Sequence, residues 1–225
     1  MNLINRIRIP LDIMMTLVSI VLMGGAYFFS ADVVHEILGV ILFVLWAVHI
    51  TFNRRWYGAL FRGKYDARRV MQTVINCSIL VCVIFLMISG IILSGHIFAF
   101  LNIQGGLGFA RVAHLLASHW YFLFMSLHIG LHVEMLAGKM KIPAKGISSI
   151  ILRVVFILLS LYGIYAFIIR GIWRYLFLLQ QFFFFDFERG YFLFALDYVS
   201  IIILFAMGIH YLSKLFNSIH NQNVA

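Results

Sequence analysis

Six long apolar stretches constrain the fold of this chain more than any other feature. They lie near residues 11–29, 34–52, 70–94, 112–137, 147–169 and 193–213. A helix needs about 20 such residues to cross a bilayer, and continuous runs differ from the short alternating segments of a β-barrel. Hydrophobic residues make up 64% of the chain and charged residues 11%, against about 45–50% and 25% in soluble domains. The sequence predicts an all-α polytopic membrane helix bundle with six transmembrane helices.

The basic residues lie mostly on one side of these predicted spans. Thirteen of the 17 Lys and Arg residues fall in the N-terminal tail, the 53–69 loop, the 138–153 region and the C-terminal tail. They are Arg6, Arg8, Arg54, Arg55, Arg62, Lys64, Arg68, Arg69, Lys139, Lys141, Lys145, Arg153 and Lys214. The positive-inside rule therefore predicts that both termini are cytoplasmic. The net charge of +9 indicates attraction to anionic lipids and not nucleic-acid binding.

The first span also has the layout of a signal peptide, because basic residues precede an apolar run that ends near Ser30-Ala31. We favour an uncleaved helix, because the run is long for a signal peptide and its retention keeps the spans alternating with the charge pattern. Residues 170–192, rich in aromatic side chains, predict an interfacial helix along the outer leaflet. Cys77 and Cys82 lie on different sides of one predicted helix, which excludes a disulfide between them.

Two histidine pairs are the most unusual feature of the predicted spans. Fourteen positions separate His35 from His49 in the second span, and fourteen separate His114 from His128 in the fourth. On a helix this spacing returns to nearly the same face about 21 Å further along the axis. The second and fourth spans are expected to run parallel, so His35 and His114 share the outer level. His49 and His128 share the inner level.

An imidazole from each of two facing helices provides the axial ligation that a low-spin haem iron requires. The spacing therefore predicts two b-type haems, the outer one ligated by His35 and His114 and the inner one by His49 and His128. Intramembrane histidines also serve as bundle residues, proton relays or metal ligands. A His-lined metal or proton transporter stays open as an alternative on this evidence, although two equal spacings on parallel helices favour haem.

Several neighbouring residues have roles that the sequence leaves open. Gly39, one turn from His35, and Gly130, after His128, would give space to a flat macrocycle or to plain helix contact. His132, one turn from His128, is a candidate contact for a haem propionate, a quinone or a proton path, or an alternative ligand. Arg54 and Arg55 near the inner haem, and Arg111 near the outer haem, are candidate propionate partners or simple anchors. We expect ordinary interfacial positions for His96, His119, His210 and His220.

The chain resembles the bacterial flavinylation-associated cytochromes. The resemblance rests on His35–Gly39 continuing to His49–Trp56, on Ser126–His132, and less specifically on Leu178–Phe187 and Asp197-Tyr198. It implies a b-type cytochrome of the bacterial cytoplasmic (inner) membrane that passes electrons to extracytoplasmic proteins carrying covalent FMN. The chain contains no flavinylation or FMN-binding segment, so this partner would be a separate protein.

These observations give one overall prediction. Residues 1–137 form a cytochrome-b-like four-helix di-haem core, and residues 138–225 add a two-helix extension. The protein is then an electron-transfer component of an oxidoreductase system, with the quinone pool as an open source of electrons. A haem-bearing membrane-anchor subunit of a quinone-linked oxidoreductase is the alternative within redox biology. Gly105–Gly108 lacks a preceding strand and fails the dinucleotide pattern, so NADH oxidation within this chain is not expected.

Overall fold

The computed structural model describes residues 3–25, 28–29, 31–139 and 145–222, with side chains between residues 7 and 216. All regular secondary structure in these residues is helical, as the apolar runs predict. The long helices are α1 (Leu3–Leu22), α2 (Asp32–Phe52), α4 (Ala67–Leu93), α5 (Leu107–Leu131), α7 (Ile147–Ile169) and α9 (Gly190–Gln222). The short ones are α3 (Arg54–Gly58), η2 (Ala99–Leu101), α6 (Val133–Lys139) and α8 (Ile172–Leu176).

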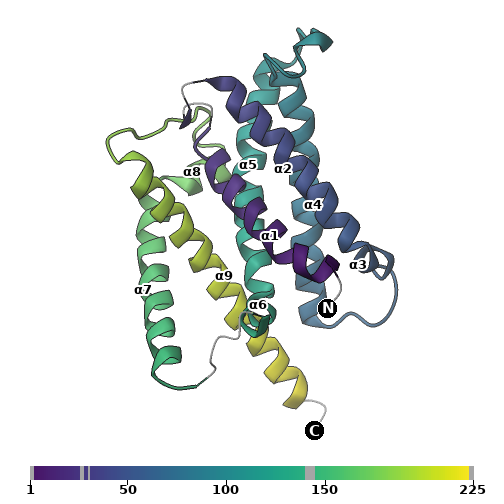
Figure 1. Cartoon of the computed structure of the whole chain (residues 1–225), viewed down its shortest axis with the longest axis vertical. Helices are drawn as coiled ribbons and strands as arrows, with labels where there is room; N and C mark the ends of the chain where they lie inside the picture. Colours follow the sequence, from purple (N-terminus) through teal and green to yellow (C-terminus); the bar gives the residue numbers. More distant parts are fainter. Residues whose placement is uncertain (1–2, 26–27, 30, 140–144, 223–225) are drawn as a thin grey trace.

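The six long helices run alternately up and down the bundle, so α2 and α5 point the same way (Figure 1). The short helices α3 and α6 lie at the lower end of this view, and η2 and α8 lie at the upper end. Most basic residues are at the lower end, which we call the basic end. It carries Arg54, Arg55, Arg62, Lys64, Arg68, Arg69, Lys139 and Lys214.

Five of the described helices are long and apolar enough to cross a membrane: α2, α4, α5, α7 and α9 up to Phe216. The first predicted span differs from its expected range, because α1 begins at Leu3 and ends at Leu22. Every 18-residue stretch of α1 includes Arg6, Arg8 and Asp12, which lowers its apolar character. The turn after it uses Gly25 with φ of +66°, a conformation that glycine adopts without strain. Of the six predicted spans, five are therefore supported by length and apolar composition, and α1 is not among them.

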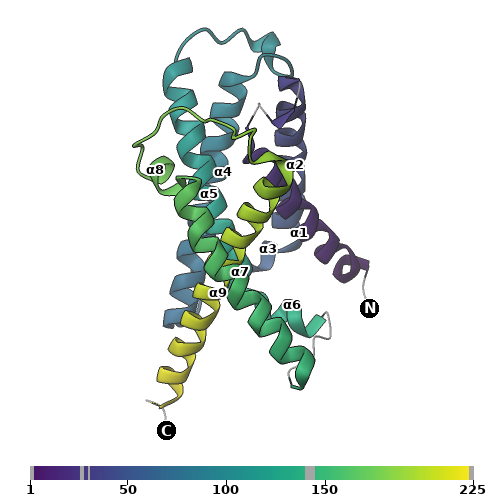
Figure 2. The same cartoon turned by 90° about the vertical axis from the view of Figure 1, so that its left-hand side faces the viewer.

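Helix α9 occupies the centre of the C-terminal half and packs between α5 and α7 (Figure 2). Glycines allow both close approaches. A Cβ added at Gly130 of α5 would lie 2.3 Å from the Ala206 carbonyl oxygen, and one added at Gly163 of α7 would lie 2.4 Å from that of Ser200. Small residues bring membrane helices into van der Waals contact in this way. Gly130 therefore serves the contact between α5 and α9.

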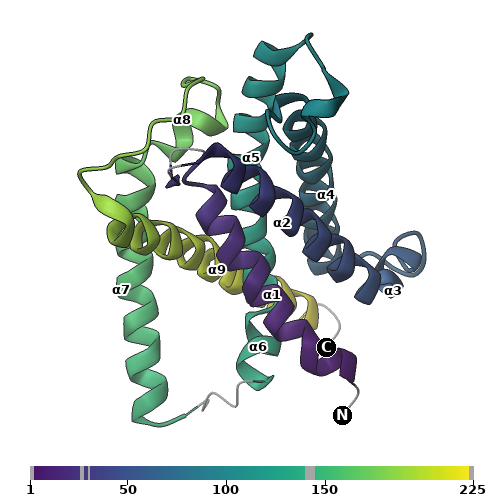
Figure 3. The same cartoon turned by 45° about the horizontal axis from the view of Figure 1, so that its top comes forward.

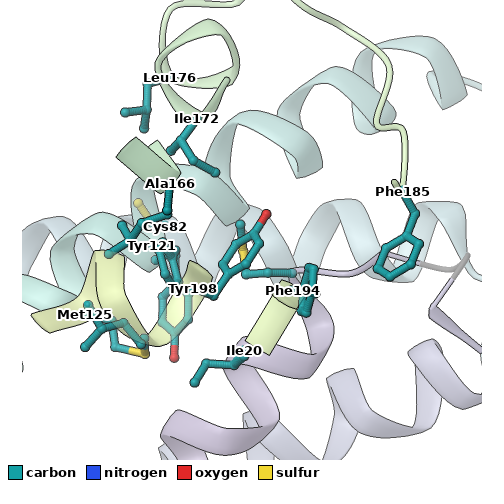
Figure 4. Packing of buried hydrophobic residues seen from close by; sticks show 14 of the residues in the cluster. Ile20, Cys82, Tyr121, Met125, Ala166, Ile172, Leu176, Phe185, Phe194 and Tyr198 are labelled. Carbon is teal, nitrogen blue, oxygen red and sulfur yellow. The ribbon is translucent and has the colours of Figure 1, made fainter. Parts of the chain in front are cut away.

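A buried aromatic and aliphatic cluster joins α9 to the rest of the bundle (Figure 4). Tyr198 packs against Phe194, with ring centroids 4.4 Å apart, and edge-on to Phe122 of α5 at 5.2 Å. Ile20 of α1 and Cys82 of α4 belong to the same cluster. Cys82 and Cys77 are both free thiols, in agreement with the sequence. The cluster thus combines helices from both halves of the chain in one core.

A buried ionic network fixes the upper ends of α7 and α9. The Asp197 carboxylate is fully buried, accepts a hydrogen bond from the Tyr162 hydroxyl at 2.6 Å, and accepts one from Arg170 Nε at 2.8 Å. Arg189 Nη2 donates to the same carboxylate at 3.2 Å. Two cations and a phenol satisfy the buried anion, which is the condition for a charge to persist in an apolar interior.

Residues 170–192 form a folded connection and not the expected continuous helix. Between α7 and α9 only Ile172–Leu176 is helical, flanked by Gly171 with φ of +61° and Leu178 with φ of +55°. A residue with left-handed backbone angles interrupts a right-handed helix, so these two residues keep α8 short. The connection also packs on the bundle, because Trp120 Nε1 donates to the Leu176 carbonyl at 3.1 Å and Phe185 is buried.

Helix α2 has no buried residue, although it carries two of the four predicted ligands. It lies alongside α1, as Figure 3 shows, and its face toward α5 borders a cavity. The two histidine-bearing helices are therefore parallel neighbours, separated by a cavity near His35 and His114.

Candidate functional site

The four histidines meet in two pairs across the space between α2 and α5. The ring centroids of His35 and His114 are 6.3 Å apart, and those of His49 and His128 are also 6.3 Å apart. The interplanar angles are 63° and 74°. The pairing predicted from the spacing is confirmed, because parallel helices bring residues of equal level together. His49 and His128 lie toward the basic end, and His35 and His114 lie toward the opposite end.

At the basic end, both imidazoles are held by acceptors on other helices. His49 Nδ1 lies 2.8 Å from the Asp12 carboxylate of α1, and His128 Nδ1 lies 2.8 Å from the Asn76 side-chain oxygen of α4. Neither oxygen carries a proton to donate, so Nδ1–H is the donor in both contacts. The lone pair of each neutral ring is then on Nε2, the nitrogen free for a ligand.

At the opposite end, the two imidazoles are held differently. His114 Nδ1 lies 2.9 Å from the Ser89 hydroxyl, which itself donates to the Phe85 carbonyl. The hydroxyl therefore accepts from Nδ1–H, which again leaves the lone pair on Nε2. His35 Nδ1 is buried and makes no hydrogen bond with the described residues, although the Gly25 carbonyl faces it.

The separation of the rings fits one metal between each pair. A metal-bound imidazole nitrogen lies about 2.0–2.1 Å from the metal, and the ring centroid lies about 1.1 Å beyond it, so two rings on opposite sides have centroids about 6 Å apart. Fixing of the second ring nitrogen by a carboxylate, amide or hydroxyl is the usual support for a histidine ligand. The donor set and spacing thus fit bis-histidine ligation of a haem iron.

A cavity of about 760 Å³ surrounds the His35–His114 pair. It extends to Trp46, one turn before His49, and most of its wall is apolar, with Phe43 and Met87 among its members. A Cβ added at Gly39 would meet nothing within 4 Å, and one at Gly90 would meet only His114 Cε1 at 3.7 Å. Its size and apolar wall are typical of a pocket for a flat organic cofactor. The sequence left Gly39 open between cofactor space and helix contact, and the structure places it beside open space.

Glu36, beside His35 in the chain, binds the loop of residues 94–97 to α2. Its carboxylate accepts from the Ser94 hydroxyl at 2.7 Å, from the backbone N–H groups of Gly95, His96 and Ile97, and contacts His96 Nδ1 at 3.1 Å. This places His96 in the loop after α4 and gives its ring a partner. The contact fixes the upper rim of the cavity.

His119 is not in the interfacial position expected for it. It is fully buried in α5, contributes to the cavity wall, and stacks on Tyr175 with ring centroids 4.3 Å apart. Its Nδ1 contacts the Leu115 carbonyl, whereas Nε2 is buried without a partner among the described residues. Burial raises the pKa of the Tyr175 phenol, which accepts from the Gln180 amide. The packing of α8 onto α5 buries His119, and spacing along one helix does not reveal this.

The remaining predicted residues have these positions. His132 follows α5, with its ring centroid 4.7 Å from that of His128, so the two are neighbours as expected. Arg54 and Arg55 are exposed in α3, and Arg111 is part of the cavity wall. His210 lies within α9 and not at its end. The side chains of Arg6, Lys141 and His220 fall outside the described residues.

The spacing of the histidines does not predict the side chains that hold the imidazoles, which are Asp12, Asn76 and Ser89. Each is a polar residue within an apolar run, which is a signal that such residues face the bundle interior. The signal does not name the partner, because contacts between α1 and α2 or α4 and α5 depend on tertiary packing.

Among the described residues, no group of three or more His, Cys, Asp or Glu side chains gathers as a site for a bare metal ion. A haem iron needs only two protein ligands, because the porphyrin supplies the others. Comparison with known proteins found no matching family model, no matching curated protein and no matching solved structure.

Proposed function

We propose that this chain is a di-haem b-type cytochrome that carries electrons across a bacterial cytoplasmic membrane. The observation that carries the proposal is the pair of 6.3 Å His–His contacts between parallel helices. Hydrogen bonds at Nδ1 leave the lone pair of His49, His114 and His128 on Nε2, and the separation within each pair suits one iron. His35 and His114 would hold one haem, and His49 and His128 the other. When bound, haem supplies a one-electron redox centre whose potential the protein tunes.

The residues around the pairs would provide the setting for this chemistry. Asp12, Asn76 and Ser89 orient three imidazoles, while Gly39 and the apolar cavity wall leave room for a macrocycle and exclude water. Arg111, in the cavity wall, is the basic residue positioned to pair with a propionate at the outer site. The two sites are about 21 Å apart along the helices, so they lie at different depths of the bilayer.

We further propose that α1 crosses the membrane as a sixth span and that the basic end is cytoplasmic. A 20-residue helix is about 30 Å long, which equals the thickness of the hydrocarbon core. The basic loops would then face the cytoplasm by the positive-inside rule. The resemblance to flavinylation-associated cytochromes supports an extracytoplasmic FMN-bearing protein as the redox partner and leaves the quinone pool as the source of electrons.

The first test is the haem content and the reduced-minus-oxidised visible spectrum of the purified protein. We expect about two b haems per chain with low-spin bis-imidazole bands. His35→Ala should remove the outer haem and His49→Ala the inner one, each leaving about one haem per chain. A folded, colourless protein from haem-replete cells would overturn the proposal in favour of metal or proton transport.

A further inference from the structure

The two histidine pairs differ in the charge of the groups that hold them. At the basic end, the Asp12 carboxylate is 2.8 Å from His49 Nδ1 and a neutral amide oxygen holds His128. At the opposite end, a neutral hydroxyl holds His114, and His35 Nδ1 has no partner among the described residues. A direct anionic contact to a ligand ring is therefore found at the basic-end pair.

An anionic acceptor on Nδ1–H raises the basicity of the opposite ring nitrogen. A more basic nitrogen donates more strongly to iron, which stabilises the oxidised, more positive state and lowers the reduction potential. Hydrogen bonds to charged acceptors are about twice as strong as those to neutral ones, so the Asn76 and Ser89 contacts have a smaller effect.

Resting on the proposed haem-binding function, we infer that Asp12 is a positioning residue that gives the basic-end site the lower reduction potential. Electrons then pass spontaneously from the basic end to the opposite end. With haem held by both histidine pairs, one electron would leave the basic-end haem, oxidising its iron from ferrous to ferric, and would reduce the iron at the opposite end from ferric to ferrous. No covalent bond forms or breaks, and the step needs no further reactant.

Two carboxylates near His35 could oppose this difference: Asp32, three residues before it in the cavity wall, and Glu36, directly after it. Asp32 is exposed, so solvent screens its charge. The two oxygens of Glu36 are occupied by donors of residues 94–97, which spread its charge over that loop. Its hydrogen bonds go to that loop, and none is made to His35 or His114. Asp12 is 41% exposed, so solvent weakens its effect and we expect a modest one.

Asp12→Asn tests the inference, because it removes the charge and keeps an oxygen near His49 Nδ1. In a redox titration of the haem-loaded protein, the lower midpoint potential should rise and the higher one should stay. Groups that hydrogen-bond to metal ligands typically change metal affinity by tenfold or more. If the change falls on one oxidation state, a tenfold effect shifts a one-electron midpoint potential by about 59 mV, and this is the rise expected for Asp12→Asn.

Two matched variants keep the test decisive even if Asp12→Asn reduces haem binding. Asn76→Asp places a carboxylate beside His128 Nδ1 and should decrease the midpoint potential of the basic-end site further. Ser89→Ala removes the neutral contact to His114 and should affect only the higher potential. The inference is overturned if a variant that retains two haems, either Asp12→Asn or Asn76→Asp, shifts the higher midpoint potential. It is also overturned if neither variant shifts the lower midpoint potential. A protein without haem overturns the proposed function itself.

Discussion

At the scale of single residues, this protein is defined by polar side chains placed in apolar surroundings. His114 depends on Ser89, His128 on Asn76, and His49 on Asp12, each through one hydrogen bond of 2.8–2.9 Å. Glycines act in two opposite ways. Gly130 has no space for a methyl group, whereas Gly39 has nothing within 4 Å of an added Cβ. Substitutions at these positions separate packing from cofactor binding.

Gly39→Leu is the residue-scale prediction for the cavity. The leucine side chain would enter the space between α2 and α5 without meeting protein atoms at its Cβ, and leucine favours helix by about 1 kcal/mol over glycine. We therefore expect unchanged or higher stability and a loss of about one haem per chain. Gly208→Leu on α9, which is exposed and open at its Cβ, is the control and should retain both haems. Full haem content in Gly39→Leu would contradict the outer-site assignment.

Asp197→Ala is a second prediction at this scale. The substitution leaves the Arg170 guanidinium, only 9% exposed, without the carboxylate that it contacts at 2.8 Å. Removal of one partner of a buried ion pair costs about 3–5 kcal/mol of folding free energy. Thermal unfolding in detergent should show a large loss of stability. Glu134→Ala is the control, because the exposed Glu134–Lys214 pair at 3.5 Å contributes about 0–1 kcal/mol. Equal effects of both variants would refute the structural role of the Asp197 network.

At the scale of elements, α9 connects the two halves of the bundle. It reaches α5 through Gly130 and α7 through Gly163, and its Phe194 and Tyr198 complete the shared aromatic cluster. Helix α2, by contrast, has no buried residue and lies beside the cavity. Helix α9 therefore contributes mainly to the buried core, and α2 mainly to the wall of the cavity.

Gly130→Ala should destabilise the protein, because the added methyl group would overlap the Ala206 carbonyl on α9. Overpacking of this kind costs about 1–3 kcal/mol. Gly208→Ala on α9, which meets nothing within 4 Å, should be neutral or slightly stabilising, because alanine favours helix by about 1 kcal/mol. The measurement is the unfolding temperature of each variant in detergent, and similar temperatures for the two would show that α5 and α9 do not approach this closely.

At the scale of the whole molecule, the up-and-down arrangement puts the basic loops at one end and residues 94–106 at the other (Figure 1). The direction of the proposed electron flow depends on which end faces the cytoplasm. This orientation can be measured independently of haem.

Cysteine labelling tests the orientation. In a variant without Cys77 and Cys82, we expect a cysteine at exposed Gln104 to react with a membrane-impermeant maleimide in intact cells. A cysteine at exposed Lys64 should react only after permeabilisation, because its loop is basic. The reverse pattern would invert the topology and, with it, the predicted direction of electron transfer.

The sequence by itself determined the all-helical fold, the ranges of most spans and the pairing of His35 with His114 and of His49 with His128. These follow from local rules, since hydrophobic length fixes a span and a spacing of fourteen residues fixes a helix face. Tertiary structure alone decided that Gly130 contacts α9, that His119 is buried under α8, and that Asp12, Asn76 and Ser89 hold the imidazoles. These contacts join helices far apart in the chain, and their geometry depends on how the helices pack, which no spacing along one helix encodes.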